Sequence, residues 1–188
     1  ELAERLKSQY PDRFDVVHRS GKLGLGTAYV AGFRHALANG FDYVIQMDCD
    51  FSHDPAALPK MLAAVQSADL AVGSRYVPGG STPGWPLLRR IISRGGSLYA
   101  KTVLGVSLND VTGGFRCIRR EALAGIDLDS LRVAGFGFQV EFNYRCHQQG
   151  YRFVEVPITF VDRRVGTSKM SSDIFFEALT MVWKLRFS

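Results

Sequence analysis

The sequence contains Tyr43-Val44-Ile45-Gln46-Met47-Asp48-Cys49-Asp50, an apolar run that ends in two carboxylates. Such a run predicts a buried strand, which would place both acids at the carboxyl edge of a sheet, where open α/β sheets bind ligands. Side chains two residues apart in an extended segment share a face, so Asp48 and Asp50 can converge. Paired carboxylates favour Mg²⁺ or Mn²⁺, which would also hold substrate phosphates. The alternative is a polar turn in which Asp50 or Ser52 starts a helix through Pro55.

The segments around this run predict an α/β domain. We expect helices at 2–9, 27–39 and 55–66, and strands at 14–18 and 70–73. The order strand, helix, strand, helix, strand favours parallel pairing with right-handed crossovers. After a loop rich in Gly and Pro, we expect helices at 85–104, 138–149 and 174–187, and strands at 115–118 and 151–161.

The composition is that of one globular domain. The 188 residues are 46% hydrophobic and 22% charged, with a net charge of +5. Basic residues cluster at Arg89, Arg90, Arg94 and Lys101, and again near the end of the chain. Such clusters suit phosphate groups, and a solvated basic surface is the alternative for each.

The cysteines and the apolar runs limit the class of protein further. Cys49, Cys117 and Cys146 are scattered, which argues against a disulfide framework and against a zinc site. Buried thiols in a reducing compartment are the expectation. No apolar stretch reaches the roughly 20 residues that a membrane-spanning helix needs.

The glycine turn Gly24-Leu25-Gly26 invites a dinucleotide-binding interpretation. Tyr29 stands where the third glycine of that pattern belongs, and the next strand ends in the Asp pair rather than in a ribose-binding acid. A tight turn into the following helix is the better prediction.

Five segments follow one another in a recognisable order. They are Tyr43–Pro55 with its Asp-Cys-Asp, Gly73–Gly80 (Gly-Ser-Arg-Tyr-Val-Pro-Gly-Gly), Trp85–Gly95, Asp110–Arg116 (Asp-Val-Thr-Gly-Gly-Phe-Arg) and Phe160–Lys169. This series resembles the dolichol-phosphate (polyprenol-phosphate) mannose synthases, inverting GT-A glycosyltransferases of family 2. The resemblance extends from Gly24 to about Lys184, and the short C-terminus is similar to the actinobacterial synthases.

The resemblance implies a GT-A fold with three α/β/α layers and a mostly parallel mixed sheet. It implies a glycosyltransferase domain over residues 1–170 and a C-terminal amphipathic helix over 171–188. The implied reaction transfers mannose from GDP-mannose to a polyprenyl phosphate with inversion, giving polyprenyl β-mannosyl phosphate and GDP.

The resemblance also assigns donor and metal residues. The implied cofactor, Mg²⁺ or Mn²⁺, would be held by Asp48, Asp50 and Ser52, although Ser52 is a weaker ligand than the residue found in some members. The implied donor-binding residues are Asp48, Cys49, Asp50, Gln139, Arg163 and Lys169. Arg163 and Lys169 match basic residues that close over the diphosphate, and a solvated basic loop is the alternative.

The acceptor phosphate is implied to lie against Arg75, Arg89 and Ser93. Arg suits this task because its planar fork makes two bonds to one phosphate, and Arg89 and Ser93 share a helical face. Arg90 is expected to be a solvated surface residue. The implied catalytic residues are Asp48, Asp50 and Arg75. A phosphate monoester is already anionic, so no general base is nominated.

Two further groups of residues are left with open roles. Asp110, Thr112 and Arg116 match the family's glycine-rich turn and are interpreted as either sugar-pocket or structural residues. Glu141 could reach the donor, or could simply be favoured at a helix N-terminus.

The expected partners are GDP-mannose, a polyprenyl phosphate, the membrane surface and a membrane-anchoring protein or domain. Segments 85–104 and 174–187 are candidates for lying in the bilayer interface, with core packing as the competing interpretation of the second. We therefore expect a cytoplasmic protein that is peripheral on the inner face of the plasma membrane. No motif supports nucleic-acid binding.

One departure from the family concerns the beginning of the chain. The family starts with a strand bearing a Pro-Thr-Tyr-Asn-Glu-like motif and a second strand ending in paired Asp, and this chain begins after both. We therefore expect an N-terminally incomplete domain. The alternatives to the mannose prediction are a transferase that uses UDP-glucose or another sugar nucleotide, and an inactive truncated domain that acts only as a binding module.

Overall fold

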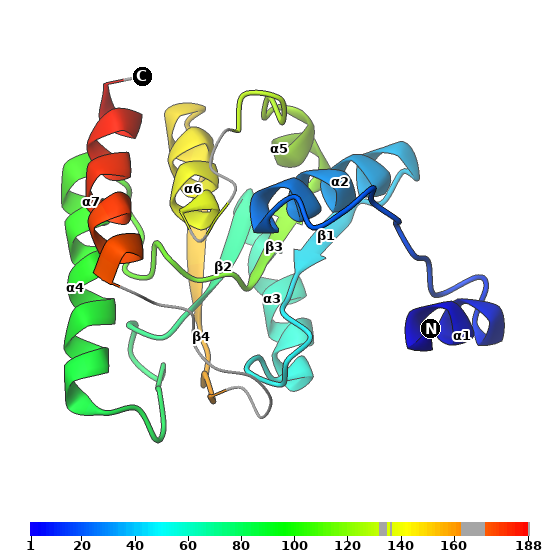
Figure 1. Ribbon diagram of the computed structural model, residues 1–188, viewed down its shortest axis with the longest axis horizontal. Helices are drawn as coiled ribbons and strands as arrows, with labels where there is room; N and C mark the ends of the chain where they lie inside the picture. Colours follow the sequence, from blue (N-terminus) through cyan, green and yellow to red (C-terminus); the bar gives the residue numbers. More distant parts are fainter. Residues whose placement is uncertain (132–134, 136, 163–171, 188) are drawn as a thin grey trace.

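A mixed sheet forms the centre of the computed structural model, with strands in the order β1-β3-β2-β4 (Figure 1). The structure describes residues 1–131, 135, 137–162 and 172–187. The strands are β1 (Tyr43–Gln46), β2 (Leu70–Ser74), β3 (Arg116–Arg119) and β4 (Phe153–Pro157). The α-helices are α1 (Leu2–Gln9), α2 (Leu25–Ala38), α3 (Leu58–Ala64), α4 (Leu87–Leu104), α5 (Arg120–Ala124), α6 (Phe138–Gln148) and α7 (Ser172–Arg186). Short 3₁₀ turns at Pro55–Ala57 and Val65–Ser67 flank α3.

The strand directions agree with the expected mixed sheet, but the pairing differs in one respect. β1 and β2 point the same way, as expected, yet β3 lies between them and pairs antiparallel with both. Only β2 and β4 are paired in parallel, with Leu70 opposite Phe153 and Ser74 opposite Pro157. The prediction that β1 and β2 pair directly is therefore wrong.

The strand expected at 14–18 does not form. Val17 is 45% exposed in this segment, and Asp15 is bonded to Lys7 and His35 rather than to a neighbouring strand. Figure 1 shows α1 standing apart from the sheet, in agreement with its lack of any buried residue. A short apolar alternation does not make a strand where the described chain offers no partner.

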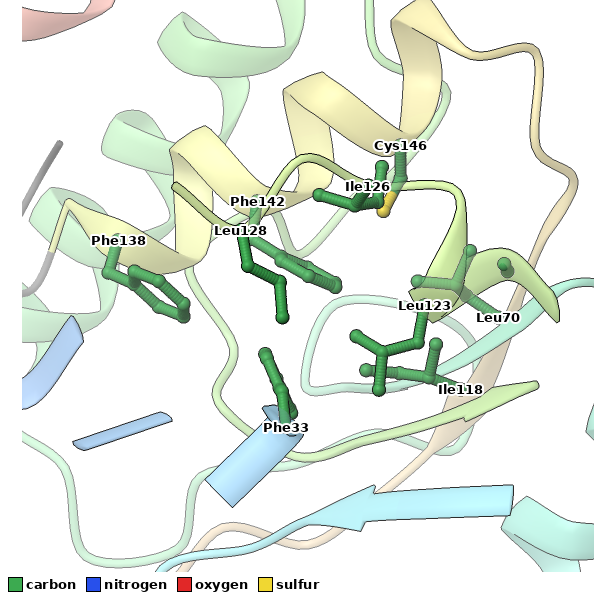
Figure 2. Packing of buried hydrophobic residues seen from close by; sticks show 10 residues of the cluster. Phe33, Leu70, Ile118, Leu123, Ile126, Leu128, Phe138, Phe142 and Cys146 are labelled. Atoms are coloured by element: carbon green, nitrogen blue, oxygen red, sulfur yellow. The ribbon is translucent and has the colours of Figure 1, made fainter. Parts of the chain in front are cut away.

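Successive residues of β2 point into different layers. Leu70 packs among residues of α2, α5 and α6, whereas Ala71 packs against α3 on the opposite face. Figure 2 shows the first of these clusters, in which Phe33 of α2 lies near Phe142 and Phe138 of α6. This alternation produces the expected three layers, because helices pack against both faces of the sheet.

A further cluster joins α4, α6 and α7. Val182 and Leu185 of α7 are buried among Ala100 and Leu104 of α4, and the Tyr99 hydroxyl donates to the Leu179 carbonyl at 3.0 Å. The two helices lie side by side in Figure 1. Core packing, the competing interpretation of the C-terminal helix, therefore holds for one face of α7.

The loop after β2 folds back tightly onto the strand end. A Cβ at Gly80 would lie 2.6 Å from the Ser74 carbonyl oxygen and 2.8 Å from that of Arg75, so only glycine fits there. Ser81 then forms a bridge to Thr159 beyond β4. The glycine-rich loop is thus fixed over the carboxyl ends of β2 and β4.

Candidate functional site

Asp48 and Asp50 lie at the carboxyl edge of the sheet, just beyond β1. The chain is extended only as far as Asp48 and then bends through residues 49–53, with Phe51 at a φ of 65°. The expectation that one extended segment presents both acids is therefore wrong, although both remain at this edge. Cys49, between them, is exposed.

Three neighbours define the position of the Asp48 carboxylate. The Tyr29 hydroxyl of α2 donates to Asp48 Oδ1 at 3.0 Å, and the Asp48 backbone N–H donates to His53 Nδ1 at 3.4 Å. A Cβ at Gly114 would lie 3.9 Å from Asp48 Oδ2 and 3.3 Å from the Gln139 amide nitrogen. The other carboxylate oxygen therefore faces a space that glycine keeps open.

His53 lies under the acids and is 5% exposed. Its ring packs against Phe115 and Phe160, with centroids 5.1 and 5.2 Å away. Burial lowers the pKa of His53, and the charges of Asp48 and Asp50 oppose that effect, while Arg75 adds to it. The Phe160 ring beside His53 also lies 5.5 Å from the Arg75 guanidinium, so one aromatic ring connects the bend that carries the acids with Arg75.

Ser52 is buried and bonds to Asp50. Its backbone N–H donates to Asp50 Oδ1 at 3.0 Å, and its hydroxyl donates to the same oxygen. The arrangement is a local side-chain turn that orients the carboxylate. A direct role for Ser52 as a metal ligand stays a prediction.

Gln139 belongs to a buried polar network beneath the acids. Its Oε1 accepts from Arg116 Nη2 at 2.6 Å and from Gln46 Nε2 at 3.0 Å, and Gln46 also donates to the Gly114 carbonyl. Gln46 is the last residue of β1, so this network fixes the end of the strand from which Asp48 extends.

Arg116, the fully buried member of the network, carries unsatisfied donors. Among the described residues, its Nε and Nη1 have no hydrogen-bond partner, and its guanidinium lies 5.1 Å from the Phe142 ring centroid. Burial lowers the pKa of Arg116 to about 10. Of the roles left open for Arg116, this environment favours a structural one.

Arg75 forms a buried ion pair with Asp110. Its Nε and Nη2 each lie 2.7 Å from an Asp110 oxygen, and its backbone N–H donates to the same carboxylate at 3.0 Å. Burial lowers the pKa of Arg75, but the bonds to Asp110 outweigh burial and raise the pKa above its usual value. Nη2 also donates to the Thr112 hydroxyl at 2.9 Å. The Arg75 charge is thus already balanced within the protein.

Arg89 and Ser93, on one face of α4, are also engaged. Arg89 lies 3.9 Å over the Trp85 ring and 2.8 Å from an oxygen of Asp162. The Ser93 hydroxyl accepts from the Tyr76 hydroxyl at 2.6 Å. Arg75 and Arg89 both contact the Trp85 ring, and the binding of a phosphate by Arg89 and Ser93 stays a prediction.

The segment 160–162 contacts both the bend that carries the acids and helix α4. The Val161 backbone N–H donates to the Ser52 carbonyl at 3.2 Å, and the Phe160 ring lies between those of His53 and Trp85. Asp162 then meets Arg89 of α4. Arg163 and Lys169, expected to close over a diphosphate, lie outside the described residues.

A cavity of about 780 Å³ opens beside Arg75, between the loop after β2 and α4. Its α4 wall consists of Leu87, Arg90, Ile91 and Arg94. This volume lies in the range of about 300–1,000 Å³ that is usual for small-ligand pockets. Neither Arg89 nor Ser93 lines it, whereas Arg90, expected to be only a solvated residue, does.

The donor set at the acids fits a hard divalent cation. Within the described residues, no group of three or more His, Cys, Asp and Glu side chains is placed to hold a metal. Two carboxylates with a neighbouring hydroxyl suit Mg²⁺ or Mn²⁺ when the substrate's phosphates and waters complete the coordination. The residues present therefore fit an ion that binds together with a diphosphate.

Sequence reasoning missed Tyr29 and His53 as residues of this site. Tyr29 was noted only as the departure from a dinucleotide-binding turn, and nothing in its position within α2 indicates a bond to Asp48. His53 lies three residues after Asp50, a spacing that gives no sign that the chain bends back under the acids.

Comparison with known proteins places the chain in a family. Residues 1–126 match the model of glycosyl transferase family 2. The undecaprenyl-phosphate mannosyltransferase of Micrococcus luteus is 51% identical over 167 residues, which cover 89% of this chain and 69% of that protein. The polyprenol monophosphomannose synthase of Mycolicibacterium smegmatis is 45% identical over 188 residues, covering 98% of this chain and 71% of that protein.

Solved structures confirm the GT-A fold. A mycobacterial protein superposes with a TM-score of 0.60 at 16% identity, covering 92% of this chain and 53% of that one. Glucosyl-3-phosphoglycerate synthase from Mycobacterium tuberculosis, in complex with Mn²⁺, UDP-glucose and glycerol 3-phosphate, gives a TM-score of 0.52 at 15% identity, with coverage of 95% and 57%. The chain thus spans just over half the length of these two solved chains, and the match shows the fold alone. From the family model and the two curated relatives together, the chain belongs to glycosyl transferase family 2.

Proposed function

We propose that the chain is the catalytic part of a polyprenyl-phosphate mannosyltransferase. It transfers mannose from GDP-mannose to a polyprenyl phosphate with inversion, and releases GDP. The two curated relatives, named for mannosyl transfer to undecaprenyl phosphate and for polyprenol monophosphomannose synthesis, support the sugar and the acceptor class. The structural observation that carries the proposal is that Phe160 contacts both His53, in the bend that carries the acids, and Arg75, which lines the cavity with Arg90 and Arg94.

On the donor side, Asp48 and Asp50 hold Mg²⁺ or Mn²⁺ together with the diphosphate of the sugar nucleotide. When bound there, such an ion would neutralise the negative charge that develops on the departing diphosphate. Tyr29 and Ser52 keep the two carboxylates oriented. Cys49 and Gln139 border the donor, and Arg163 and Lys169 close over its diphosphate.

On the acceptor side, the nucleophile is an oxygen of the phosphate monoester. That oxygen forms a bond to the anomeric carbon while the bond from that carbon to the GDP oxygen breaks, and GDP leaves with the electron pair. Because the monoester is anionic at neutral pH, the step needs no proton transfer. Arg75, Arg89 and Ser93 position the phosphate for attack opposite the leaving group.

The acceptor's hydrocarbon chain lies in a bilayer, so the protein must meet a membrane surface. Leu87, Leu88 and Leu98 of α4 are between 61% and 69% exposed. Trp183 of α7 is 49% exposed, and Phe187, directly after α7, is 79% exposed. Such apolar side chains on helices with basic residues suit the bilayer interface. Within the described ranges, we find no helix with the length and hydropathy to cross a bilayer. We place the protein on the cytoplasmic face of the plasma membrane, beside an anchoring protein or domain.

The test is a transfer assay with radiolabelled GDP-mannose, Mg²⁺ or Mn²⁺, and undecaprenyl phosphate. We expect lipid-extractable label that depends on the divalent ion. Asp50→Asn should remove transfer. Asp54→Asn is the matched control, because exposed Asp54 only caps the turn at Pro55–Ala57, and Asn caps equally well.

Each alternative has its own outcome in this assay. Label transferred from UDP-glucose but not from GDP-mannose would overturn the mannose assignment. Sugar-nucleotide binding without transfer from any donor would favour a binding module. Full activity in Asp50→Asn would refute the metal assignment.

A further inference from the structure

The cavity beside Arg75 has two arginines on its α4 wall whose charges are not paired with any described acid. Arg90 and Arg94 are one helical turn apart, and both line the cavity. Both are exposed, and neither guanidinium makes an ion pair or a hydrogen bond with another described residue. By contrast, Asp110 balances the third cation at the cavity, Arg75.

Placing these two charges together has a cost for the helix. Like charges four residues apart destabilise a helix, by roughly as much as opposite charges stabilise it. Within the described part of the chain, the cavity therefore carries about two positive charges that no acid balances. Two positive charges would match a phosphate monoester, whose own charge approaches about −2 at neutral pH.

The same cavity wall is apolar between the arginines. Leu87 and Ile91 are 69% and 59% exposed, and they alternate with Arg90 and Arg94 along one face of α4. A free phosphate or a nucleotide would leave these side chains without apolar contacts. A phosphate that carries a hydrocarbon chain could contact the arginines with its phosphate and the two apolar side chains with its chain.

We propose that Arg90 and Arg94 bind the phosphate of a prenyl-chain phosphomonoester, whose first hydrocarbon units lie against Leu87 and Ile91. The inference rests on the proposed function, in which that ligand is the acceptor. It assigns the first docking of the acceptor to Arg90 and Arg94, from which the phosphate passes to Arg75, Arg89 and Ser93 for attack. Without a ligand, Arg89 contacts Asp162 and Trp85, and Ser93 is bonded to Tyr76. From this cavity the phosphate lies beside Arg75.

The first experiment measures binding without any sugar donor. Farnesyl phosphate is titrated by calorimetry into the wild-type chain and into the Arg90→Gln/Arg94→Gln variant. Loss of two charge-assisted contacts should weaken binding by at least about tenfold. Lys101→Gln, a charge removal on the same helix outside the cavity, should stay within about twofold. Farnesol and inorganic phosphate should each bind the wild type far more weakly than farnesyl phosphate.

The second experiment distinguishes acceptor binding by Arg90 and Arg94 from general electrostatic attraction to the membrane. In the transfer assay, the double variant should raise the KM for the prenyl phosphate about tenfold, while the KM for GDP-mannose stays unchanged. Equal farnesyl phosphate binding by the variant and the wild type would overturn the proposal. So would a variant that loses binding only to phosphatidylglycerol vesicles, because the arginines would then recognise bilayer headgroups. Circular dichroism confirms that the variant is folded.

These outcomes also separate this inference from the proposed function. If farnesyl phosphate binds through the pair but no sugar is transferred, the docking position stands and the transfer activity is refuted. If transfer proceeds with an unchanged acceptor KM in the variant, the activity stands and the docking position is refuted.

Discussion

Replacement of Asp110 by Asn should strongly destabilise the protein. The Asp110 side chain has no exposed surface and that of Arg75 is 10% exposed, so the substitution leaves a cation almost without water or counter-charge. An Asn has one acceptor oxygen for the three Arg75 donors that lie 2.7–3.0 Å from the carboxylate. Removing one partner of a buried pair costs about 3–5 kcal/mol. For a domain of this size, that corresponds to a fall of about 6–20 °C in Tm.

The measurement is urea unfolding followed by circular dichroism, with the free energy of unfolding extrapolated to water. Asp129→Asn is the matched control: Asp129 pairs with Arg34, but its side chain is 85% exposed, so its loss should cost at most about 1 kcal/mol. Asp110→Leu combined with Arg75→Met should be less destabilised than Asp110→Leu alone, because no charge is left unpaired. A cost below about 1 kcal/mol for Asp110→Asn would show that water reaches Arg75, and would refute the reasoning.

Three further predictions concern the donor side and the membrane face. Gly114→Ala fills the space beside the acids, so we expect a raised KM for the sugar nucleotide with unchanged far-ultraviolet circular dichroism; an unchanged KM would contradict the position of the donor. Burial raises the pKa of Cys117 to about 11 and that of Cys146 to about 12, so only exposed Cys49 should react with Ellman's reagent at pH 8. GDP-mannose with Mn²⁺ should slow that reaction if Cys49 borders the donor. Trp183→Ala should reduce co-sedimentation with anionic vesicles, and unaltered sedimentation would place α7 away from the bilayer.

The sequence was sufficient to predict the order of most elements and the position of the acids. Each of those predictions depended on local information: an apolar run before two carboxylates, or glycine at a helix end. The position of β3 could not be obtained in this way. Its short run, Arg116–Arg119, has a strand's composition, but nothing within it indicates that it inserts antiparallel between β1 and β2.

Whether each arginine is already paired with an acid could also not be predicted from the sequence. Arg75, Arg89 and Arg90 all appear as cations near the expected acceptor site. Whether a cation is available to a ligand depends on long-range partners, and Asp110 lies 35 residues from Arg75 while Asp162 lies 73 residues from Arg89. Only the folded chain shows that two of these charges are already balanced, whereas that of Arg90 faces the cavity.

The short segment 160–162 has a thermodynamic consequence for the two substrates. It contacts the acid-bearing bend through Val161 and α4 through Asp162, so it offers a direct connection between the two parts of the site. If donor binding at the bend changes the acceptor's affinity at α4 by some factor, acceptor binding must change the donor's affinity by the same factor. Under the proposed function, any coupling that this segment carries would therefore be equal in both directions, whichever substrate binds first.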